Sequence, residues 1–417
     1  MRKLIYIVLF SIFATHNLCS CREESEDLFS YQNMMLQKDT TYAGQFKIFW
    51  TYMDYNYSMW DYEQSQGLDW DEVYRKFLPK FEEYDKKEEK LTSELKNLYL
   101  EIVNPLHDGH MVLVISNPNP RYIRMPFSVM PQYNRIQESR LDSDPPSPTP
   151  EKLLIYGNQI KEIHPTGNTI RDNYFCVFSD NIIYYKPREE TRDIICNSTE
   201  NEEGKTWKEM FATIQDLSIN DSLKGIVIDL RCFGGGTIYN FHYLIGALHP
   251  INQTNNYHRI GWFRQKTGIG RYDYTPKMPF LYKMDETYQL NITDVPIVVL
   301  ANCYTRSLGE VICLAAKQIK NGCVVGMRSW GGLSPLGAEG TINDITIKSP
   351  TYLGDKSGDY SLYASVAEGT YFTDDGEILD GKGVAPDIEV QLDTEEYEST
   401  GRDTQLERAL EFIRTGK

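Results

Sequence analysis

One segment of the sequence, residues 295–322, constrains the fold more than any other. Residues 295–300 read Val-Pro-Ile-Val-Val-Leu, a short apolar run that is typical of a buried strand. A polar turn follows at residues 301–306, and from Ser307 the apolar residues recur at helical spacing as far as Gly322. The sequence therefore predicts a buried strand that passes through one turn into a helix, with Ser307 at the junction.

The segments around this junction alternate in the same way. Apolar strands are expected at residues 225–230, 297–300 and 323–326, and helices at residues 207–218, 238–248 and 307–320. Apolar strands separated by helices are typical of a mostly parallel sheet with helices on its faces. We therefore expect residues 187–417 to form an α/β domain.

The first half of the chain shows two other patterns. Residues 41–115 carry aromatic and aliphatic residues at helical spacing and end in a short turn and an apolar strand, which predicts an N-terminal helical region. Residues 116–186 contain short strand-like runs around a proline-rich stretch and are expected to form a small β-rich insert. The strands of this insert are expected at residues 126–130, 152–156, 174–178 and 182–185.

The N-terminus resembles an export signal. Two basic residues precede an apolar run that is too short to span a bilayer comfortably. The run closes with residues 18–21, Leu-Cys-Ser-Cys, which resemble the lipobox at which bacterial lipoproteins are cut and acylated. We expect a signal peptide over residues 1–20 and a lipid-anchored tether over residues 21–40 that begins at Cys21. An ordinary secretory signal is the alternative. The acidic residues 22–27 resemble a tag for export to the outer surface.

Charge and cysteine spacing exclude several kinds of partner. A formal net charge of −16 over 417 residues argues against electrostatic binding of nucleic acid or of anionic lipid headgroups. The cysteines form no CxxC pair and no disulfide-dense spacing, so the sequence predicts neither a metal knuckle nor a disulfide scaffold. We expect no metal ion and no cofactor.

Ser307 is the first candidate for chemistry. At the N-terminus of the predicted helix, free backbone N–H groups and the positive end of the helix dipole point outward. Such a position suits a serine that attacks a carbonyl group and whose oxyanion must be held. The alternative is that Ser307 only caps the helix, which is the commonest role for such a serine.

A glycine run and a histidine turn are the other candidates. Residues 234–236 are glycines that follow a buried strand, where backbone N–H groups can approach a ligand closely. An oxyanion hole fits this run, a phosphate loop fits poorly because its sequence patterns are missing, and a turn with positive φ is the structural alternative. His107 and His110 flank Asp108, which suits a general base, a metal site or a surface turn, although no third cluster of metal ligands is present.

Together these motifs resemble the tail-specific, or C-terminal processing, serine protease family. Residues 229–236 resemble its strand-and-glycine signature, residues 302–310 its nucleophile loop and residues 383–390 its closing strand. Residues 70–71 and 106–110 resemble the branch that contains the tricorn core protease and the interphotoreceptor retinoid-binding protein repeats. The resemblance implies a ClpP/crotonase-like α/β core.

The resemblance also implies roles for single residues. Ser307 would be the nucleophile and His110 its base. The processing-protease branch uses a lysine base, but the matching position here is Gly332, which favours the histidine. The implied oxyanion hole consists of backbone N–H groups of three residues: Leu308, Gly234 and Gly235.

Acidic residues complete the implied site. Asp380 matches the residue that orients the histidine, where the family usually has a glutamate, and Glu368 and Glu377 are the next candidates. Glu310 matches the acidic residue after the nucleophile, and we expect it to be a structural group behind it. No PDZ-like segment is recognisable in the β-rich insert, so recognition of a substrate's C-terminus does not follow.

The function implied by the resemblance is that of a serine peptidase in the bacterial cell envelope. It would be lipid-anchored in the outer membrane or at the cell surface and would hydrolyse peptides or partly unfolded proteins through an acyl-enzyme. The alternative is a non-catalytic surface lipoprotein that binds an apolar or glycan ligand on the same fold. A purely structural surface protein would leave the glycine and histidine motifs without a role.

Overall fold

The computed structural model describes most of the chain from residue 41 to residue 417. The residues outside the description are 1–40, 89–91, 117–126, 130–148, 166–172, 188–201, 237, 239–240, 242–244, 249–256, 268–269, 284–289, 291, 293, 336–339, 343–344, 348–350 and 357–359. The expected signal peptide, Cys21 and the tether over residues 21–40 lie outside the described residues. In the part that is described, no helix combines the length and the apolar character needed to cross a membrane.

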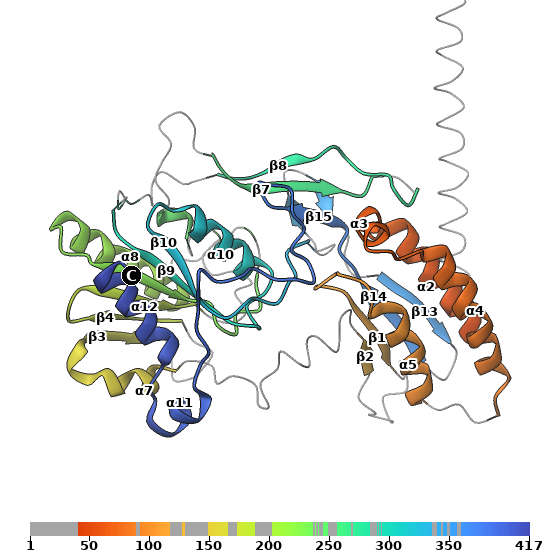
Figure 1. Ribbon diagram of the computed structural model, residues 1–417, viewed down its shortest axis with the longest axis horizontal. Helices are drawn as coiled ribbons and strands as arrows, with labels where there is room; N and C mark the ends of the chain where they lie inside the picture. The colour runs from red at the N-terminus through yellow and green to blue at the C-terminus, as the bar shows by residue number, and fades with distance from the viewer. Residues whose placement is uncertain are drawn as a thin grey trace, which may run out of the picture.

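A seven-stranded sheet forms the centre of the C-terminal part of the chain (Figure 1). In spatial order its strands are β16 (Ile388–Glu389), β10 (Gly322–Gly326), β9 (Ile297–Ala301), β6 (Gly225–Asp229), β5 (Ile182–Lys186), β4 (Tyr174–Phe178) and β3 (Ile160–Pro165). The strands from β16 to β5 are parallel, and β4 and β3 add to one edge in antiparallel fashion. The predicted α/β fold with a mostly parallel sheet is confirmed.

Successive residues of a strand point to opposite faces of the sheet, so these apolar strands place side chains on both faces. Helices cover both faces. Helices α8 (Glu202–Ile219) and α10 (Leu308–Gln318) contribute to the apolar core on the face of Ile226. Helix α12 (Thr404–Thr415) contributes to the core on the opposite face, that of Val227. Figure 1 shows α10 and α12 against the strands they cover.

The helical region near the N-terminus packs with a separate antiparallel sheet (Figure 1). Its helices are α2 (Tyr42–Asn56), α3 (Trp60–Ser65), α4 (Trp70–Lys86) and α5 (Thr92–Val103). The sheet consists, in spatial order, of β13 (Thr351–Lys356), β14 (Tyr360–Ser365), β1 (Val112–Ser116) and β2 (Phe127–Val129). The helices expected in residues 41–115 are therefore present, and the chain returns to them through β13 and β14, which the sequence pattern did not predict.

The remaining elements connect or extend these two parts. Two smaller sheets consist of β15 (Gly369–Phe372), β7 (Tyr257–Gln265) and β8 (Met278–Lys283), and of β11 (Gly340–Ile342) and β12 (Ile345–Ile347). Short helical elements are α7 (Pro150–Leu153), η1 (Leu154–Gln159), η3 (Gly246–Leu248) and α11 (Thr394–Thr400). Arg264 on β7 forms an ion pair of 2.7 Å with Asp61 on α3, which joins the small sheet to the N-terminal helices.

Residues 152–156 differ from the sequence-based expectation of a strand. They lie in α7 and η1 and are helical. Pro150 occupies the first turn of α7, and the Thr149 side chain accepts a hydrogen bond from the Lys152 N–H (3.4 Å). Both features start helices rather than strands, and they outweigh the short apolar run.

The expected domain boundary at residue 186 does not separate two structural units. Strands β3, β4 and β5 belong to the segment expected as a β-rich insert, yet they are strands of the central sheet. Much of the helix expected over residues 238–248 lies outside the described residues, and its described end is the 3₁₀ turn η3.

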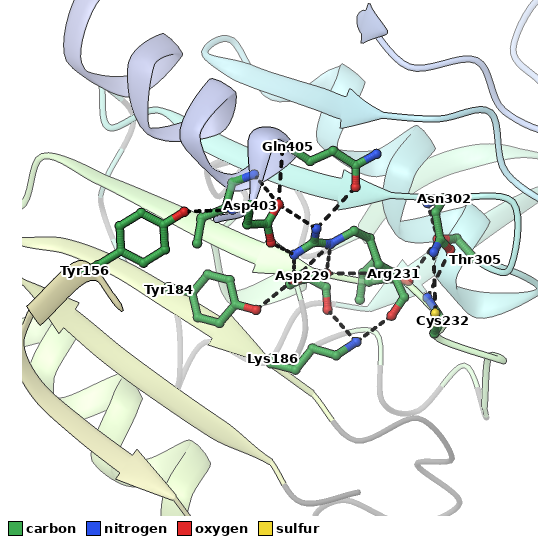
Figure 2. Close-up of polar contacts among 12 residues, drawn as sticks. Tyr156, Tyr184, Lys186, Asp229, Arg231, Cys232, Asn302, Thr305, Asp403 and Gln405 are labelled. Atoms are coloured by element: carbon green, nitrogen blue, oxygen red, sulfur yellow. Dashed lines mark hydrogen bonds and ion pairs between the residues drawn. The ribbon is translucent and has the colours of Figure 1, made fainter. Parts of the chain in front are cut away.

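A buried ion-pair network fixes the loop that follows β6 (Figure 2). The Arg231 guanidinium donates to Asp229 (2.5 Å) and to Asp403 (2.7 Å), and Lys186 Nζ donates to the Arg231 carbonyl (2.5 Å). Burial acts to raise the pKa of Asp229, but the charges of Arg231 and Lys186 hold it below its ordinary value. Removing one partner of a buried ion pair typically costs about 3–5 kcal/mol. Because Asp403 is the N-cap residue of α12, the network ties this helix to the start of the glycine run.

Candidate active site

Ser307 lies at the N-cap position of α10 in a backbone conformation that residues other than glycine rarely adopt. Its φ is 57° and its ψ is −122°. An ordinary N-cap residue has an extended backbone, which causes no strain. A strained conformation costs of order 1–3 kcal/mol and persists only where the surrounding structure holds it. A capping role alone therefore does not account for Ser307.

Glu310 holds this strained turn from inside the protein. Its carboxylate is fully buried and accepts one hydrogen bond from the Ser307 N–H (3.1 Å). It accepts three more from Ser329 Oγ (2.6 Å), the Gly331 N–H (2.6 Å) and the Gly332 N–H (2.7 Å). Burial raises the pKa of Glu310, although these hydrogen bonds act to lower it. Both carboxylate oxygens already accept two hydrogen bonds, so Glu310 supports the Ser307 backbone rather than facing a ligand.

The loops that follow β6 and β9 are joined by side-chain hydrogen bonds (Figure 2). Asn302 Oδ1 accepts from the Cys232 N–H (3.0 Å), and Thr305 Oγ1 donates to the Leu230 carbonyl (2.8 Å). Because the carboxyl ends of parallel strands meet at one edge of a sheet, the glycine run and the Ser307 turn lie side by side there. These bonds then fix the position of one loop relative to the other.

Gly235 lies directly against Ser307. Its φ is +113°, and a Cβ atom added to it would lie 2.6 Å from Ser307 Cβ and 3.1 Å from Ser307 Oγ, so a side chain cannot be accommodated. In the described structure, no acceptor pairs with the backbone N–H of Gly234, Gly235 or Leu308. Unpaired N–H groups beside a serine hydroxyl are suited to hold a developing oxyanion.

His110 is buried, and among the described residues only one of its ring nitrogens has a hydrogen-bond partner. Its Nδ1 lies 2.7 Å from the Ser334 carbonyl oxygen, and 6% of the residue's surface is exposed. A carbonyl oxygen can only accept a hydrogen bond, so the proton of the neutral ring lies on Nδ1 and Nε2 is left as a base. Burial, and next the charge of Arg306, lowers the pKa of His110 to about 3.

The turn that carries His110 is fixed by Asp108 and by close backbone packing. Asp108 Oδ1 accepts from the His110 N–H (2.8 Å), and its Oδ2 accepts from the Ala367 N–H (2.7 Å). Burial raises the pKa of Asp108 to about 6. A Cβ atom added to Gly109 would lie 1.8 Å from the Gly331 carbonyl oxygen. The histidine turn therefore sits on the same 329–332 segment that Glu310 connects to Ser307.

In the described structure no hydrogen bond joins Asp380 to His110, in contrast to the role expected from its sequence position. Its carboxylate accepts hydrogen bonds from the Leu333 N–H (3.1 Å), the Ser334 N–H (2.9 Å) and Ser334 Oγ (2.7 Å). Asp380 thus positions Ser334, whose carbonyl in turn orients the His110 ring. Burial raises the pKa of Asp380.

Neither of the alternative carboxylates is a hydrogen-bond partner of His110. Glu377 is exposed and pairs with Lys382 (3.2 Å). The Glu368 carbonyl accepts from the Lys266 N–H (3.1 Å), and none of the described hydrogen bonds of His110 involves Glu368. Ser334 was not singled out from the sequence, because nothing in a short polar segment shows that its carbonyl will face a histidine more than 200 residues away.

The sequence also offered His107 as a candidate base or metal ligand, and Gly332 as the position where the processing-protease branch has its lysine base. His107 Nδ1 pairs with Glu63 (2.8 Å), away from the ring of His110. A Cβ atom on Gly332 would lie 3.2 Å from the backbone of Gly109, so the histidine turn occupies the space beside this position. Among the described residues, no group of three or more His, Cys, Asp or Glu side chains could hold a metal ion.

Comparisons with solved structures show a shared fold. A candidate peptidase from Parabacteroides merdae is 18% identical, with a TM-score of 0.61 over 89% of this chain and 96% of that one. Mature CPAF in complex with lactacystin is 11% identical, with a TM-score of 0.57 over 90% of this chain and 99% of that one.

Comparisons of sequence find tricorn-like relatives and a domain of a known peptidase family. A candidate tricorn-like protease C-terminal subunit of Sulfurisphaera tokodaii is 32% identical over 116 residues, 28% of this chain. Tricorn protease of Thermoplasma volcanium is 22% identical over 279 residues, 63% of this chain. The chain spans only 12% and 23% of the length of these two relatives. Residues 195–390 match Peptidase family S41. The chain thus carries a Peptidase family S41 domain, which takes up just under half of its length.

Proposed function

We propose that this protein is a serine peptidase that hydrolyses peptides or partly unfolded proteins through an acyl-enzyme. The observation that carries the proposal is a strained, half-buried Ser307 that lies beside backbone N–H groups with no described acceptor. The segment that Glu310 connects to Ser307 also packs against the turn of His110, whose ring is neutral and held in one orientation. A protein that only binds a ligand has no need of a strained serine or of a ring held in one tautomer. The S41 domain supports the same reaction class.

In the proposed reaction, His110 Nε2 takes the hydroxyl proton as Ser307 Oγ attacks the carbonyl carbon of the substrate. The backbone N–H groups of Leu308, Gly234 and Gly235 hold the oxyanion that forms. The protonated ring then gives its proton to the leaving amine, the C–N bond breaks, and an ester to Ser307 remains. Water, deprotonated by the same ring, hydrolyses this ester and restores the enzyme.

We also propose that the protein is anchored to the cell envelope through a lipid on Cys21, on the basis of the apolar run that ends at residues 18–21. In cells, Cys21→Ala should move the protein out of the membrane fraction or block cleavage of the signal. Incorporation of labelled fatty acid is the direct measurement. Equal incorporation into wild type and Cys21→Ala would exclude this residue as the anchor.

A fluorophosphonate probe tests the proposed nucleophile and base. The wild type should be labelled at Ser307, and Ser307→Ala should not be labelled. His110→Ala should lose at least about 100-fold in labelling rate, because a general base contributes about 10²–10⁴-fold. His107→Ala, the matched control, should keep most of the rate because His107 pairs with Glu63 instead. Equal rates in both histidine variants would refute the role of His110.

The pH profile tests the environment of the base. Because the pKa of His110 is lowered to about 3, its ring stays neutral and competent well below neutral pH. We expect the labelling rate at pH 5 to remain above half of its value at pH 8, whereas a histidine of pKa about 6.5 would retain only about 3%. Circular dichroism at each pH must show folded protein. The lowered pKa of His110 also reduces the free energy of unfolding as the pH falls from about 6.5 toward 3. A midpoint near pH 6.5 in folded protein would contradict the shift.

The indirect contact of Asp380 predicts an intermediate loss of activity. Asp380→Asn should lower the labelling rate by about 100-fold, the effect of misplacing a catalytic group by about 1 Å. A carboxylate bonded directly to the base would cost about 10⁴-fold. Ser334→Ala keeps the carbonyl that faces His110 and should cost less than Asp380→Asn. Glu377→Gln, a surface control, should not change the rate. An undiminished rate in folded Asp380→Asn would remove it from the site.

A further inference from the structure

Arg306, the residue directly before Ser307, has an incomplete set of partners. Its Nε is buried and has no hydrogen-bond partner, and no ion pair or hydrogen bond joins its guanidinium to any described residue. A guanidinium carries five N–H donors and no acceptor. Removing the Nε donor from water without supplying an acceptor is costly. Among the described residues, the surroundings of this half-buried guanidinium therefore lack an anion that would match it.

None of the described residues supplies this anion. Glu310 is the acidic residue whose charge acts on Arg306, but both of its oxygens already accept two hydrogen bonds each. The Trp330 ring lies 5.7 Å from the Arg306 guanidinium carbon. This cation–π contact attracts the charge but offers no acceptor for the N–H groups.

The Arg306 side chain lies on the His110 side of the site. Its backbone is fixed, because its N–H donates to the Phe233 carbonyl (3.0 Å). A Cβ atom added to Gly332 would lie 3.4 Å from Arg306 Cγ and 3.2 Å from the backbone of Gly109, the residue before the base. Trp330, which contacts the guanidinium, donates from Nε1 to the Gly109 carbonyl (2.8 Å). The charge of Arg306 is also close enough to act on the pKa of His110.

In the proposed reaction, the place of Arg306 beside His110 corresponds to one side of the substrate. The base donates its proton to the leaving amine, so groups beside the base face the part of the substrate that departs. Resting on the proposed function, we propose that Arg306 binds a substrate carboxylate on the leaving-group side of the scissile bond. A carboxylate matches the planar fork of a guanidinium and can bind two N–H groups at once. In a protein of net charge −16, such a local positive charge also offsets the general repulsion of acidic ligands.

The carboxylate has two possible sources, the C-terminus of a peptide and the side chain of Asp or Glu. Four short alanine-based peptides distinguish them. One pair differs only in a free or an amidated C-terminus, and the second pair is amidated and differs only in Asp or Asn near the C-terminus. Binding is measured by calorimetry on the whole chain carrying Ser307→Ala, which prevents turnover.

We expect the acidic member of one pair to bind about 10- to 100-fold more tightly than its neutral partner, as for a charge-assisted, bidentate contact. If the peptide with the free C-terminus binds more tightly than its amide, Arg306 binds the C-terminal carboxylate. If the Asp peptide binds more tightly than the Asn peptide, Arg306 binds an acidic side chain. Arg306→Gln should reduce the ratio to near one, and Arg306→Lys should keep part of it. Arg328→Gln is the matched control, because this exposed arginine already donates to the Gly383 carbonyl (3.1 Å) and should leave the ratio unchanged.

Equal affinities within both pairs, or a preference that survives Arg306→Gln in folded protein, would overturn the inference. Failure of the proposed function is recognised separately, by the absence of fluorophosphonate labelling in the wild type. A preference that depends on Arg306 would still support carboxylate binding in that case, because the binding experiment does not require turnover.

Discussion

The buried carboxylate of Glu310 is the interaction on which the candidate site depends. It has no ion-pair partner among the described residues, so it is tolerable in the interior only because two donors surround each oxygen. These donors come from Ser307 and from the 329–332 segment on which the histidine turn packs. One carboxylate thus holds both the strained Ser307 and the segment against which the turn of His110 packs. Its loss would leave buried N–H groups unpaired at both places.

The partner of the His110 ring determines what kind of base His110 would be in the proposed reaction. A carboxylate would fix the tautomer and also stabilise the imidazolium, whereas the Ser334 carbonyl does the first and contributes little to the second. With Arg306 close by, protonation of the ring is further disfavoured. In the proposed reaction this ring would stay available as a base in acid but would take a proton less readily, so catalysis would rely more on the oxyanion donors. The effect of Asp380 is correspondingly geometric, through the position of Ser334.

Features that depend on near neighbours in the sequence could be predicted, and those that depend on tertiary packing could not. The change from an apolar run to helical spacing was enough to predict the junction at Ser307. The shared edge of parallel strands then accounts for the glycine run beside it. The strands at 174–178 and 182–185 were recognised but assigned to a separate insert, because a hairpin has the same pattern alone or at the edge of a larger sheet. The bond between Asp380 and Ser334 spans 46 residues without any periodicity, so no local signal could reveal it.

Proton binding to the buried groups around His110 changes stability in opposite directions. The pKa of His110 in the folded chain is about 3, so the unfolded chain binds this proton first, and stability falls as the pH drops from about 6.5 toward 3. The pKa of Asp108 is raised to about 6, so the folded chain binds this proton first, and stability rises as the pH drops from about 6 toward 4. The two effects oppose each other over the same range of pH. The turn can therefore carry a neutral base in mildly acidic solution without the full loss of stability that a buried histidine would cause by itself.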